Sequence, residues 1–179
     1  SVYEHCTIVA DIADQLLTRR TQSVDRDMVR AGCLLHDIGV YALYVNGEID
    51  TKNYIRHGVL GAEILRNEGF EEPLCRFCSH HTGVGLPKAQ IIARNLPLPH
   101  EGFLAETEEE EVVMFADKFH SKTVPPRFNA PEAYAEHLRQ FGEKNVATFA
   151  KFIEKYGLPD LDALSLKYGH KVLTHVTVH

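Results

Sequence analysis

His36 and Asp37 stand side by side at the end of an apolar segment, residues 28–35, that has the pattern of a helix. A neutral imidazole and a carboxylate together suit first-row divalent metals such as iron, manganese, cobalt, nickel or zinc. An ionised Asp in apolar surroundings is costly without a partner, and a metal ion is one partner that removes the cost. A single dipeptide is weak evidence, so a metal site requires that other ligands recur along the chain.

Further imidazoles and a carboxylate do recur, each in a segment with helical signals. The ordered set is His5, His36-Asp37, His57, His80-His81 and Asp117. A lone His on an apolar helix is usually a hydrogen-bonded core residue, whereas a full ordered set indicates a metal site. The other histidines join no such set: they are His100, His120, His137, His170, His175 and His179.

Five short segments of the chain resemble the HD-domain superfamily of metal-dependent phosphohydrolases, in its five-histidine form that holds two metals. These segments are 4–10, 34–39, 56–62, 79–83 and 115–118. The resemblance spans about residues 3–120. It implies an all-α helical bundle whose metal site lies in the core between helices.

The resemblance also implies how the ligands are shared between two divalent metals, with Asp37 as the bridge. The first metal would also take His5, His36 and Asp117. The second would also take His57 and one or both of His80 and His81. Residues 81–83 are similar to the sequence around the corresponding ligand in bacterial HD-type diadenosine tetraphosphatases, which favours His81. His80 would then be an outer-shell base or a substrate contact.

Mixed imidazole and carboxylate ligands fit iron or manganese, with zinc, cobalt, nickel or magnesium as alternatives. Two close metals polarise a phosphate and lower the pKa of a bridging water, and the resulting hydroxide attacks phosphorus without a Ser or Cys nucleophile. The candidate catalytic residues are Asp37, His80 and Lys118. The candidate substrate-binding residues are Lys118, Arg127 and, more weakly, Arg56. Lys and Arg side chains are more often solvated surface charges, and that reading stays open for these three.

The leading hypothesis is therefore a metal-dependent phosphohydrolase that acts on a small phosphate ester or a nucleotide. Cyclic dinucleotide phosphodiesterases of the superfamily carry Gly-Tyr-Pro after the double His, whereas this chain has Gly83-Val84-Gly85-Leu86-Pro87. Some HD-fold proteins that resemble this ligand set are mixed-valent di-iron oxygenases, which is the first alternative. A non-catalytic, metal-containing ligand sensor is the second.

Length and composition favour a single domain with the composition of an ordinary soluble protein. The chain has 179 residues and a net charge of −6, which argues against a general nucleic-acid binder. No apolar run approaches the roughly 20 residues of a membrane span, and no signal peptide is visible, so we expect a cytoplasmic protein.

The four cysteines do not have the spacing of a disulfide framework. Cys75 and Cys78 are either half of a zinc site or, as we favour, small buried residues. Oligomeric state is not decided by the sequence.

Apolar periodicity and capping signals outline the elements that must position these residues. Helices are expected over about 2–20, 23–36, 56–67, 74–81, 107–119, 131–156 and 160–168. Ser23 is a candidate N-cap, and Thr107 begins a capping box. Residues 41–55 favour an irregular loop or a small hairpin around Asn46-Gly47. We expect a single HD domain over 1–179, with a metal-binding core over about 1–122 and a C-terminal helical extension over about 130–179.

Overall fold

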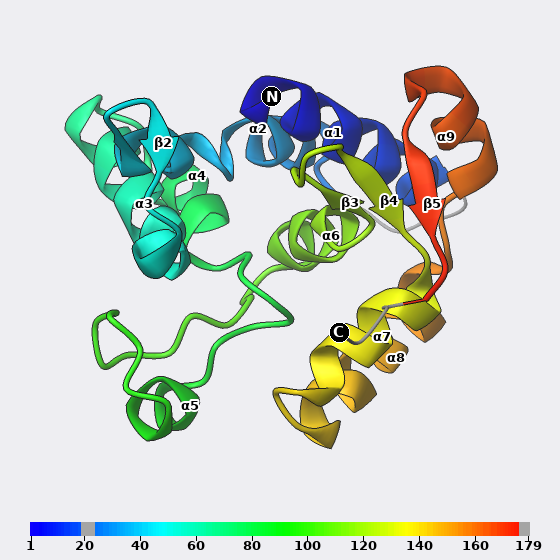
Figure 1. Ribbon diagram of the computed structural model, residues 1–179. Coiled ribbons are helices and arrows are strands. Elements are labelled where there is room, and N and C mark those ends of the chain that lie inside the picture. The colour runs from blue at the N-terminus through cyan, green and yellow to red at the C-terminus, as the bar shows by residue number, and fades with distance from the viewer. Residues whose placement is uncertain (19–23, 176–179) are drawn as a thin grey trace.

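Helices make up most of the computed structural model, which describes residues 1–18 and 24–175 (Figure 1). Five of them surround the centre of the molecule: α1 (Val2–Thr18), α2 (Arg26–Leu35), α3 (His57–Asn67), α4 (Glu72–Ser79) and α6 (Glu108–Asp117). α1 packs on α2 and α6, α2 also packs on α4 and α6, and α3 packs on α4. The predominantly all-α fold confirms the expected fold class.

The remaining elements lie around this bundle. α5 (Lys88–Ala93) lies on the long connection between α4 and α6, and α7 (Pro131–Arg139), α8 (Glu143–Tyr156) and α9 (Leu161–Tyr168) follow α6. Two 3₁₀ helices, Ile38–Leu43 and Thr51–Arg56, flank the hairpin formed by β1 (Tyr44–Val45) and β2 (Glu48–Ile49). Within the described ranges, no helix has both the length and the apolar character that crossing a membrane requires.

Side-chain caps fix the starts of two helices that carry site residues. Asp25 caps α2 by accepting a hydrogen bond from the backbone N–H of Met28 at 3.0 Å. Thr107 caps α6 by accepting from the N–H of Glu110 at 3.1 Å, as the capping box predicts. Ser23, the cap expected for α2, lies outside the described residues. Each such cap contributes about 1 kcal/mol to helix stability.

An aromatic cluster joins α6 to the C-terminal helices. The ring of Phe115 on α6 packs edge-on against that of Phe119 at 4.9 Å and lies 5.7 Å from that of Phe149 on α8. All three side chains are fully buried. Aromatic pairs contribute about 0.5–1.5 kcal/mol each to stability beyond the burial of their surface. This aromatic cluster therefore stabilises the position of α6, the helix that ends at Asp117.

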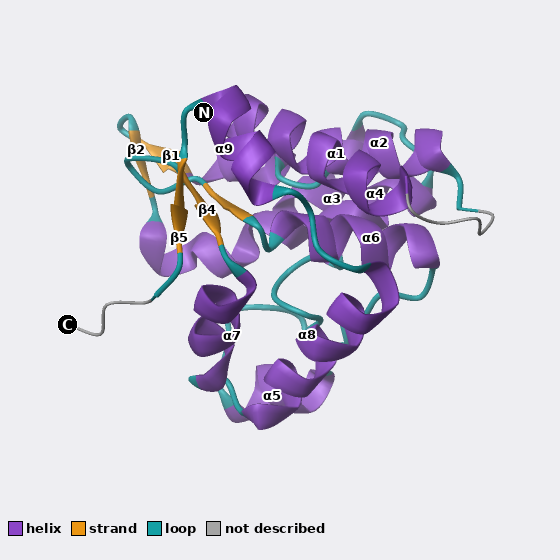
Figure 2. Cartoon of the chain, turned by 90° about the vertical axis from the view of Figure 1, so that its right-hand side faces the viewer, coloured by secondary structure: helices purple, strands orange, loops and turns teal. Residues whose placement is uncertain are grey.

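A three-stranded sheet that the helical periodicity did not predict covers one side of the bundle (Figure 2). β3 (His120–Ser121) pairs antiparallel with β4 (Arg127–Asn129), and β4 pairs parallel with β5 (Lys171–Leu173). These strands are too short to show an alternating pattern in the sequence. They bring the last described residues of the chain beside the segment that follows Asp117.

The segment 131–156, expected as one helix, forms two. α7 ends at Arg139 and α8 begins at Glu143, with Gly142 between them at a φ of 110°. That left-handed conformation suits Gly and interrupts a right-handed helix, whereas the apolar periodicity of the sequence continues across the break. The two helices pack against each other as a hairpin.

Glycines allow the backbones next to the site to approach closely. A Cβ on Gly39 would lie 1.9 Å from the carbonyl oxygen of His57, and one on Gly58 would lie 2.7 Å from that of Cys78. Neither position accepts a side chain without displacing backbone. Gly39 therefore brings the turn after Asp37 against the start of α3, and Gly58 brings that start against the end of α4.

Candidate metal centre

Residues on or next to five helices bring their imidazoles and carboxylates together in one buried cluster. His5 lies on α1, His36 and Asp37 follow α2, His57 begins α3, His81 follows α4, and Asp117 ends α6. His5, His36, Asp37, His57 and His81 are buried, and the Asp117 side chain is 14 % exposed. Three sets of ligand atoms lie close enough to hold an ion: His5/His36/Asp37, His36/His81/Asp117 and Asp37/His57/His81.

The two oxygens of Asp37 face different imidazoles. Oδ2 lies 3.3 Å from Nε2 of His5 and 3.6 Å from Nε2 of His36. Oδ1 lies 3.5 Å from Nε2 of His57 and 3.6 Å from Nε2 of His81. Asp37 thus stands between two groups of nitrogen atoms, with one oxygen toward each.

Asp117 closes the first of these groups. Its Oδ1 lies 2.9 Å from Nε2 of His5 and 3.4 Å from Nε2 of His36. Two carboxylates and two imidazoles therefore surround the side of the cluster nearest α1. The side nearest α3 has two imidazoles and the remaining oxygen of Asp37.

Backbone carbonyls orient three of the imidazoles. Nδ1 of His36 donates to the carbonyl of Cys33 at 2.7 Å, Nδ1 of His57 to that of Tyr54 at 2.6 Å, and Nδ1 of His81 to that of Cys78 at 2.7 Å. These bonds place the proton on Nδ1 and direct the lone pair of Nε2 into the cluster, as metal-binding histidines require.

The imidazole lone pairs that point into the cluster and one carboxylate oxygen have the chemistry of a cation site. Nε2 of His57 and Nε2 of His81 lie 3.0 Å apart, each with its lone pair turned inward. Oδ1 of Asp37 is buried and has no hydrogen-bond partner in the described part of the chain. Such an oxygen costs free energy unless a cation or donor approaches it. The donor set therefore fits a divalent metal.

The charges of the cluster are coupled. Burial alone would raise the pKa of Asp37, but His36 and Lys122 outweigh it and hold that pKa far below the ordinary Asp value. Burial alone would lower the pKa of His36, but Asp37 outweighs it and raises that pKa well above the ordinary value. Burial lowers the pKa of His5 to about 4 and that of His81 well below 6.5. His5 and His81 are thus neutral beside ionised carboxylates, which are the protonation states that a metal needs, whereas His36 would release a proton when a metal binds.

His80 does not join the cluster. Its Nδ1 lies 2.6 Å from Oγ of Ser79, and its ring packs edge-on against Phe103 at 5.5 Å. The double His therefore separates into one buried residue that faces Asp37 and one half-buried residue that faces away from it. The backbone geometry at the end of α4 decides this, and the dipeptide alone could not.

The three basic residues singled out from the sequence lie in different places. Lys118 is buried, and its Nζ donates to Oδ2 of Asp117 at 2.7 Å and to the carbonyl of His81 at 2.9 Å. Arg127 is exposed on β4 and lines a cavity next to the cluster. Arg56 is exposed and is not among the described residues that line this cavity.

Lys122 also contacts the cluster, although no sequence motif includes it. Its Nζ donates to Oδ2 of Asp37, and its side chain is 22 % exposed. The hydroxyl group of Tyr54 lies beside it, and burial raises the pKa of that hydroxyl to about 12. Lys122 belongs to none of the matched motifs, and its spacing from Asp117 alone gave no signal.

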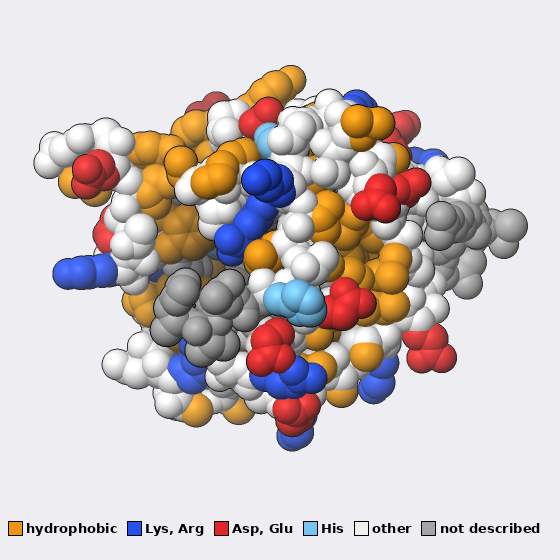
Figure 3. Space-filling model, turned by 45° about the vertical axis from the view of Figure 1, so that its right-hand side comes forward, with side chains coloured by type: hydrophobic (Ala, Val, Ile, Leu, Met, Phe, Trp, Pro, Cys, Tyr) orange, Lys and Arg blue, Asp and Glu red, His pale blue; other side chains and the backbone are white. Residues whose placement is uncertain are grey.

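The cavity next to the cluster has a volume of about 790 Å³. Its walls include Tyr44, Tyr54, Asp117, Lys118 and Lys122, together with Arg127, Tyr134 and His137. Lys and Arg side chains gather near the middle of the face seen in Figure 3, among apolar ones. The cavity thus combines aromatic walls with several cations, which suits an anionic ligand with an aromatic part.

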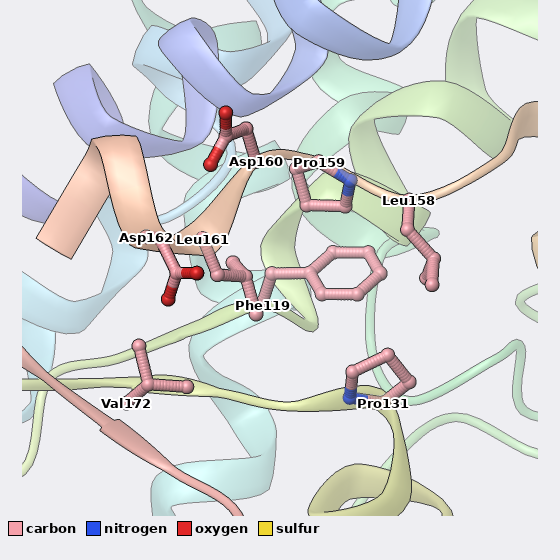
Figure 4. A pocket seen from close by; sticks show the side chains of 8 residues that line it. All are labelled: Phe119, Pro131, Leu158, Pro159, Asp160, Leu161, Asp162 and Val172. Carbon is pink, nitrogen blue, oxygen red and sulfur yellow. The ribbon is translucent and has the colours of Figure 1, made fainter.

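A smaller cavity of about 290 Å³ lies at the start of α9 (Figure 4). It is lined by Phe119, Pro131, Leu158, Pro159, Asp160, Leu161, Asp162 and Val172. Asp160 already accepts a hydrogen bond from the N–H of Ala163 as the cap of α9. No His or Cys and no basic residue is among this described lining, so it does not compete as the metal centre.

Cys75 and Cys78 are free and buried. The thiol of Cys78 donates to the carbonyl of Leu35 at 3.3 Å, and burial raises the pKa of that thiol. None of the candidate metal-ligand groups found among the described residues contains a cysteine. These observations support the interpretation of both residues as small packing groups.

Comparison with known proteins identifies the family of this chain. The model of the HD domain family matches residues 2–122. An uncharacterised protein of Methanocaldococcus jannaschii is 39% identical over 120 residues, which cover 65% of this chain and 64% of that protein. A tRNA (cytidine(56)-2'-O)-methyltransferase of Picrophilus torridus is 33% identical over 130 residues, which cover 64% of this chain and 35% of that protein. The tRNA (cytidine(56)-2'-O)-methyltransferase of Thermoplasma volcanium is 37% identical over 95 residues, which cover 53% of this chain and 25% of that protein. The chain spans less than two thirds of the length of each relative.

Solved structures show the same fold at low sequence identity. The HD domain of the Listeria monocytogenes phosphodiesterase PgpH has a TM-score of 0.55 at 16% identity, with 93% of both chains covered. The same domain in complex with cyclic-di-AMP has a TM-score of 0.54 at 15% identity, with 97% of this chain and 94% of that chain covered. With the family match over most of its length and the buried His and Asp cluster in place, this chain belongs to the HD domain family.

Proposed function

We propose that this chain is a metal-dependent phosphohydrolase that cleaves a small phosphate ester or a nucleotide. The observation that carries this proposal is the position of Asp37, whose two oxygens face two different groups of inward-directed imidazole nitrogens. Such an arrangement suits two divalent ions that share one carboxylate. Iron or manganese matches the mixed ligand set best.

Asp37 would hold both ions. The first ion would also take His5, His36 and Asp117, and the second His57 and His81. His81 is preferred to His80 because its Nε2 faces Asp37, whereas the ring of His80 packs against Phe103. When bound, the ions polarise the phosphate and lower the pKa of a bound water.

The chain's own residues would position the ligands and the substrate. Lys118 ties Asp117 to the backbone at His81, so it joins the two ligand groups and acts as a positioning residue. Lys122 and Arg127 line the cavity and would bind the phosphate oxygens. Arg offers a fixed fork of donors and Lys a mobile point charge, and both are ordinary phosphate partners.

The cavity supports a substrate of nucleotide size. A volume of about 790 Å³ lies within the range of about 300–1,000 Å³ that is typical of small-molecule sites. The aromatic side chains of Tyr44 and Tyr54 offer stacking surfaces for a base. The likeness to the PgpH domain in complex with cyclic-di-AMP supports the nucleotide class, while residues 83–87 lack the Gly-Tyr-Pro element of cyclic dinucleotide phosphodiesterases.

The test combines metal analysis of freshly purified protein with an anaerobic screen of phosphate esters and nucleotides. Each substrate is offered with Mn, Fe, Co, Ni, Zn or Mg. We expect phosphate or nucleotide release that depends on the added metal and is lost in Asp37→Asn. Substrate-dependent O₂ uptake by an iron-loaded protein would favour an oxygenase instead. Metal binding without turnover of any compound would favour a ligand sensor.

A further inference from the structure

A row of three imidazoles runs from the cluster toward the surface. Nδ1 of His5 lies 2.8 Å from Nδ1 of His120, and Nε2 of His120 lies 3.0 Å from Nδ1 of His170. The three rings are stacked, with centroids 5.1 and 5.2 Å apart. Nε2 of His170 faces Oε1 of Glu4 at 4.0 Å. Two of its three members, His120 and His170, belong to no sequence motif.

His5 differs from the other imidazoles of the cluster in what holds its outer nitrogen. His36, His57 and His81 each donate from Nδ1 to a backbone carbonyl, which can only accept. Nδ1 of His5 instead meets another imidazole, which can either donate or accept. Nε2 of His5 faces Oδ1 of Asp117 at 2.9 Å, which favours a proton on Nε2 as long as no metal ion is there. With a metal ion at Nε2, the proton of His5 has to lie on Nδ1, and His120 has to accept it.

A neutral imidazole carries one proton, on Nδ1 or on Nε2, so it donates from one nitrogen and accepts at the other. A row of such rings has two consistent directions of donation. Only one of them leaves Nε2 of His5 without a proton: Nδ1–H of His5 donates to His120, and Nε2–H of His120 donates to His170.

The C-terminal extension holds the end of this row in place. His170 follows Gly169, which ends α9 at a φ of 71°, and it precedes β5, which pairs with β4. The hydroxyl of Ser165 donates to the carbonyl of His170 at 2.7 Å. His170 lies beyond residues 2–122, which the HD domain model matches. The extension therefore reaches the ligand shell of the cluster.

We propose that His120 and His170 are positioning residues of the metal centre, which hold His5 with its proton on Nδ1 and its Nε2 free for a metal ion. This proposal rests on the metal centre of the proposed function. Outer partners of metal-binding histidines change metal affinity by about 10–100-fold when they are removed. The C-terminal extension is thus part of the metal site as well as a cover for the bundle.

The test compares two substitutions of His170 in the full chain. His170→Leu keeps apolar bulk and removes the acceptor, whereas His170→Asn keeps an acceptor oxygen near the position of Nδ1. Zn²⁺ affinity is measured by competition with a chelating dye at constant pH. We expect His170→Leu to weaken Zn²⁺ binding about tenfold and His170→Asn to stay within about threefold of wild type. His100→Leu, an exposed His outside the cavity and the row, is the control and should bind Zn²⁺ as wild type does.

Histidine ¹⁵N NMR of the Zn²⁺-loaded wild type gives a readout that needs no variant. We expect the proton of His120 on Nε2, and a proton on Nδ1 would overturn the proposal. Equal loss of Zn²⁺ affinity in both His170 variants would assign His170 to packing alone, and no loss in His170→Leu would remove it from the site. Wild-type protein that binds no Zn²⁺ would instead refute the metal centre itself, and with it the proposed function.

Discussion

The ammonium group of Lys122 contacts Oδ2 of Asp37, although 85 positions separate the two residues in the sequence. The Asp37 side chain is 1 % exposed and that of Lys122 is 22 % exposed. The cluster thus contains a cation of its own, on a side chain that also borders the cavity. That cation stands against the oxygen that faces His5 and His36, where we propose one of the metal ions.

Replacing Lys122 with Met tests its effects on metal binding and on the stability of the metal-free protein. Lys122→Met removes a positive charge in contact with a proposed ligand, so we expect Mn²⁺ or Zn²⁺ to bind about tenfold more tightly, which corresponds to about 1.4 kcal/mol. We also expect the metal-free protein to unfold more easily, by about 3 kcal/mol, because Asp37 loses a buried partner. Dye competition and urea unfolding measure the two effects.

The matched control is Lys167→Met. Lys167 pairs with Asp11 at the surface, so its removal should change the free energy of unfolding by no more than about 1 kcal/mol and leave metal affinity unchanged. Weaker metal binding in Lys122→Met would contradict the competition between Lys122 and the metal. Phosphate-ester turnover should fall in the same variant through a higher KM, because the cavity loses a phosphate-binding cation.

Asp37→Asn tests the bridge. The amide keeps the shape of the carboxylate, but its NH₂ group cannot bind a metal, so one of the two ligand groups loses its shared oxygen. We expect the bound metal to fall from two ions per chain to one or none, and metal-dependent turnover to fall at least about a thousandfold. Elemental analysis after dialysis and rate measurements in metal-defined buffer check this. An unchanged rate would refute the site.

His81→Ala and His80→Ala together test which member of the double His binds metal. His81 is buried with its Nε2 toward Asp37, whereas His80 packs on Phe103. We expect His81→Ala to lose one metal ion per chain and nearly all turnover. His80→Ala should keep its metal content, and a fall in its turnover alone would mark His80 as a substrate contact. The opposite pattern of metal loss would reverse the assignment.

Most residues of the candidate metal centre could be predicted from the sequence because each lies in a short motif on a helix or next to one. His5, His36, Asp37, His57 and Asp117 converge because helix ends and glycines place them there. The helical periodicity and the cap at Thr107 likewise predict most of the bundle.

Residues that reach the cluster through strands or from outside the motifs could not be predicted. Lys122 follows a two-residue strand, and His170 reaches the row of imidazoles through the pairing of β5 with β4. Long-range pairing of such short strands leaves no periodic pattern. His120 follows the matched segment 115–118 but belongs to no motif itself, so its contact with His5 depends on the three-dimensional arrangement alone.

An ion pair between Arg76 on α4 and the buried Glu110 on α6 makes the stability of the folded state sensitive to acid. Arg76 donates to both oxygens of Glu110, at 2.6 and 3.1 Å, and the N–H of Glu106 donates to the same carboxylate at 2.7 Å. Burial alone would raise the pKa of Glu110, but the bond from Arg76 outweighs it and lowers that pKa below 4.5. The ionised form therefore stabilises the folded state.

The sign of the pH effect follows from this lowered pKa. The contribution of Glu110 is fully present above the pKa of an unfolded Glu, about 4.5, and is lost as the pH falls from there through the folded-state value. We expect Glu110→Gln to lower the free energy of unfolding by about 2 kcal/mol at pH 7, and the difference from wild type to shrink below pH 4.5. Glu72→Gln, which removes an exposed pair with Arg66, should cost about 0.5 kcal/mol or less. Urea unfolding of the three proteins at a series of pH values measures these differences, and a wild-type minus Glu110→Gln difference that stays constant down to pH 3 would contradict the role of the charge.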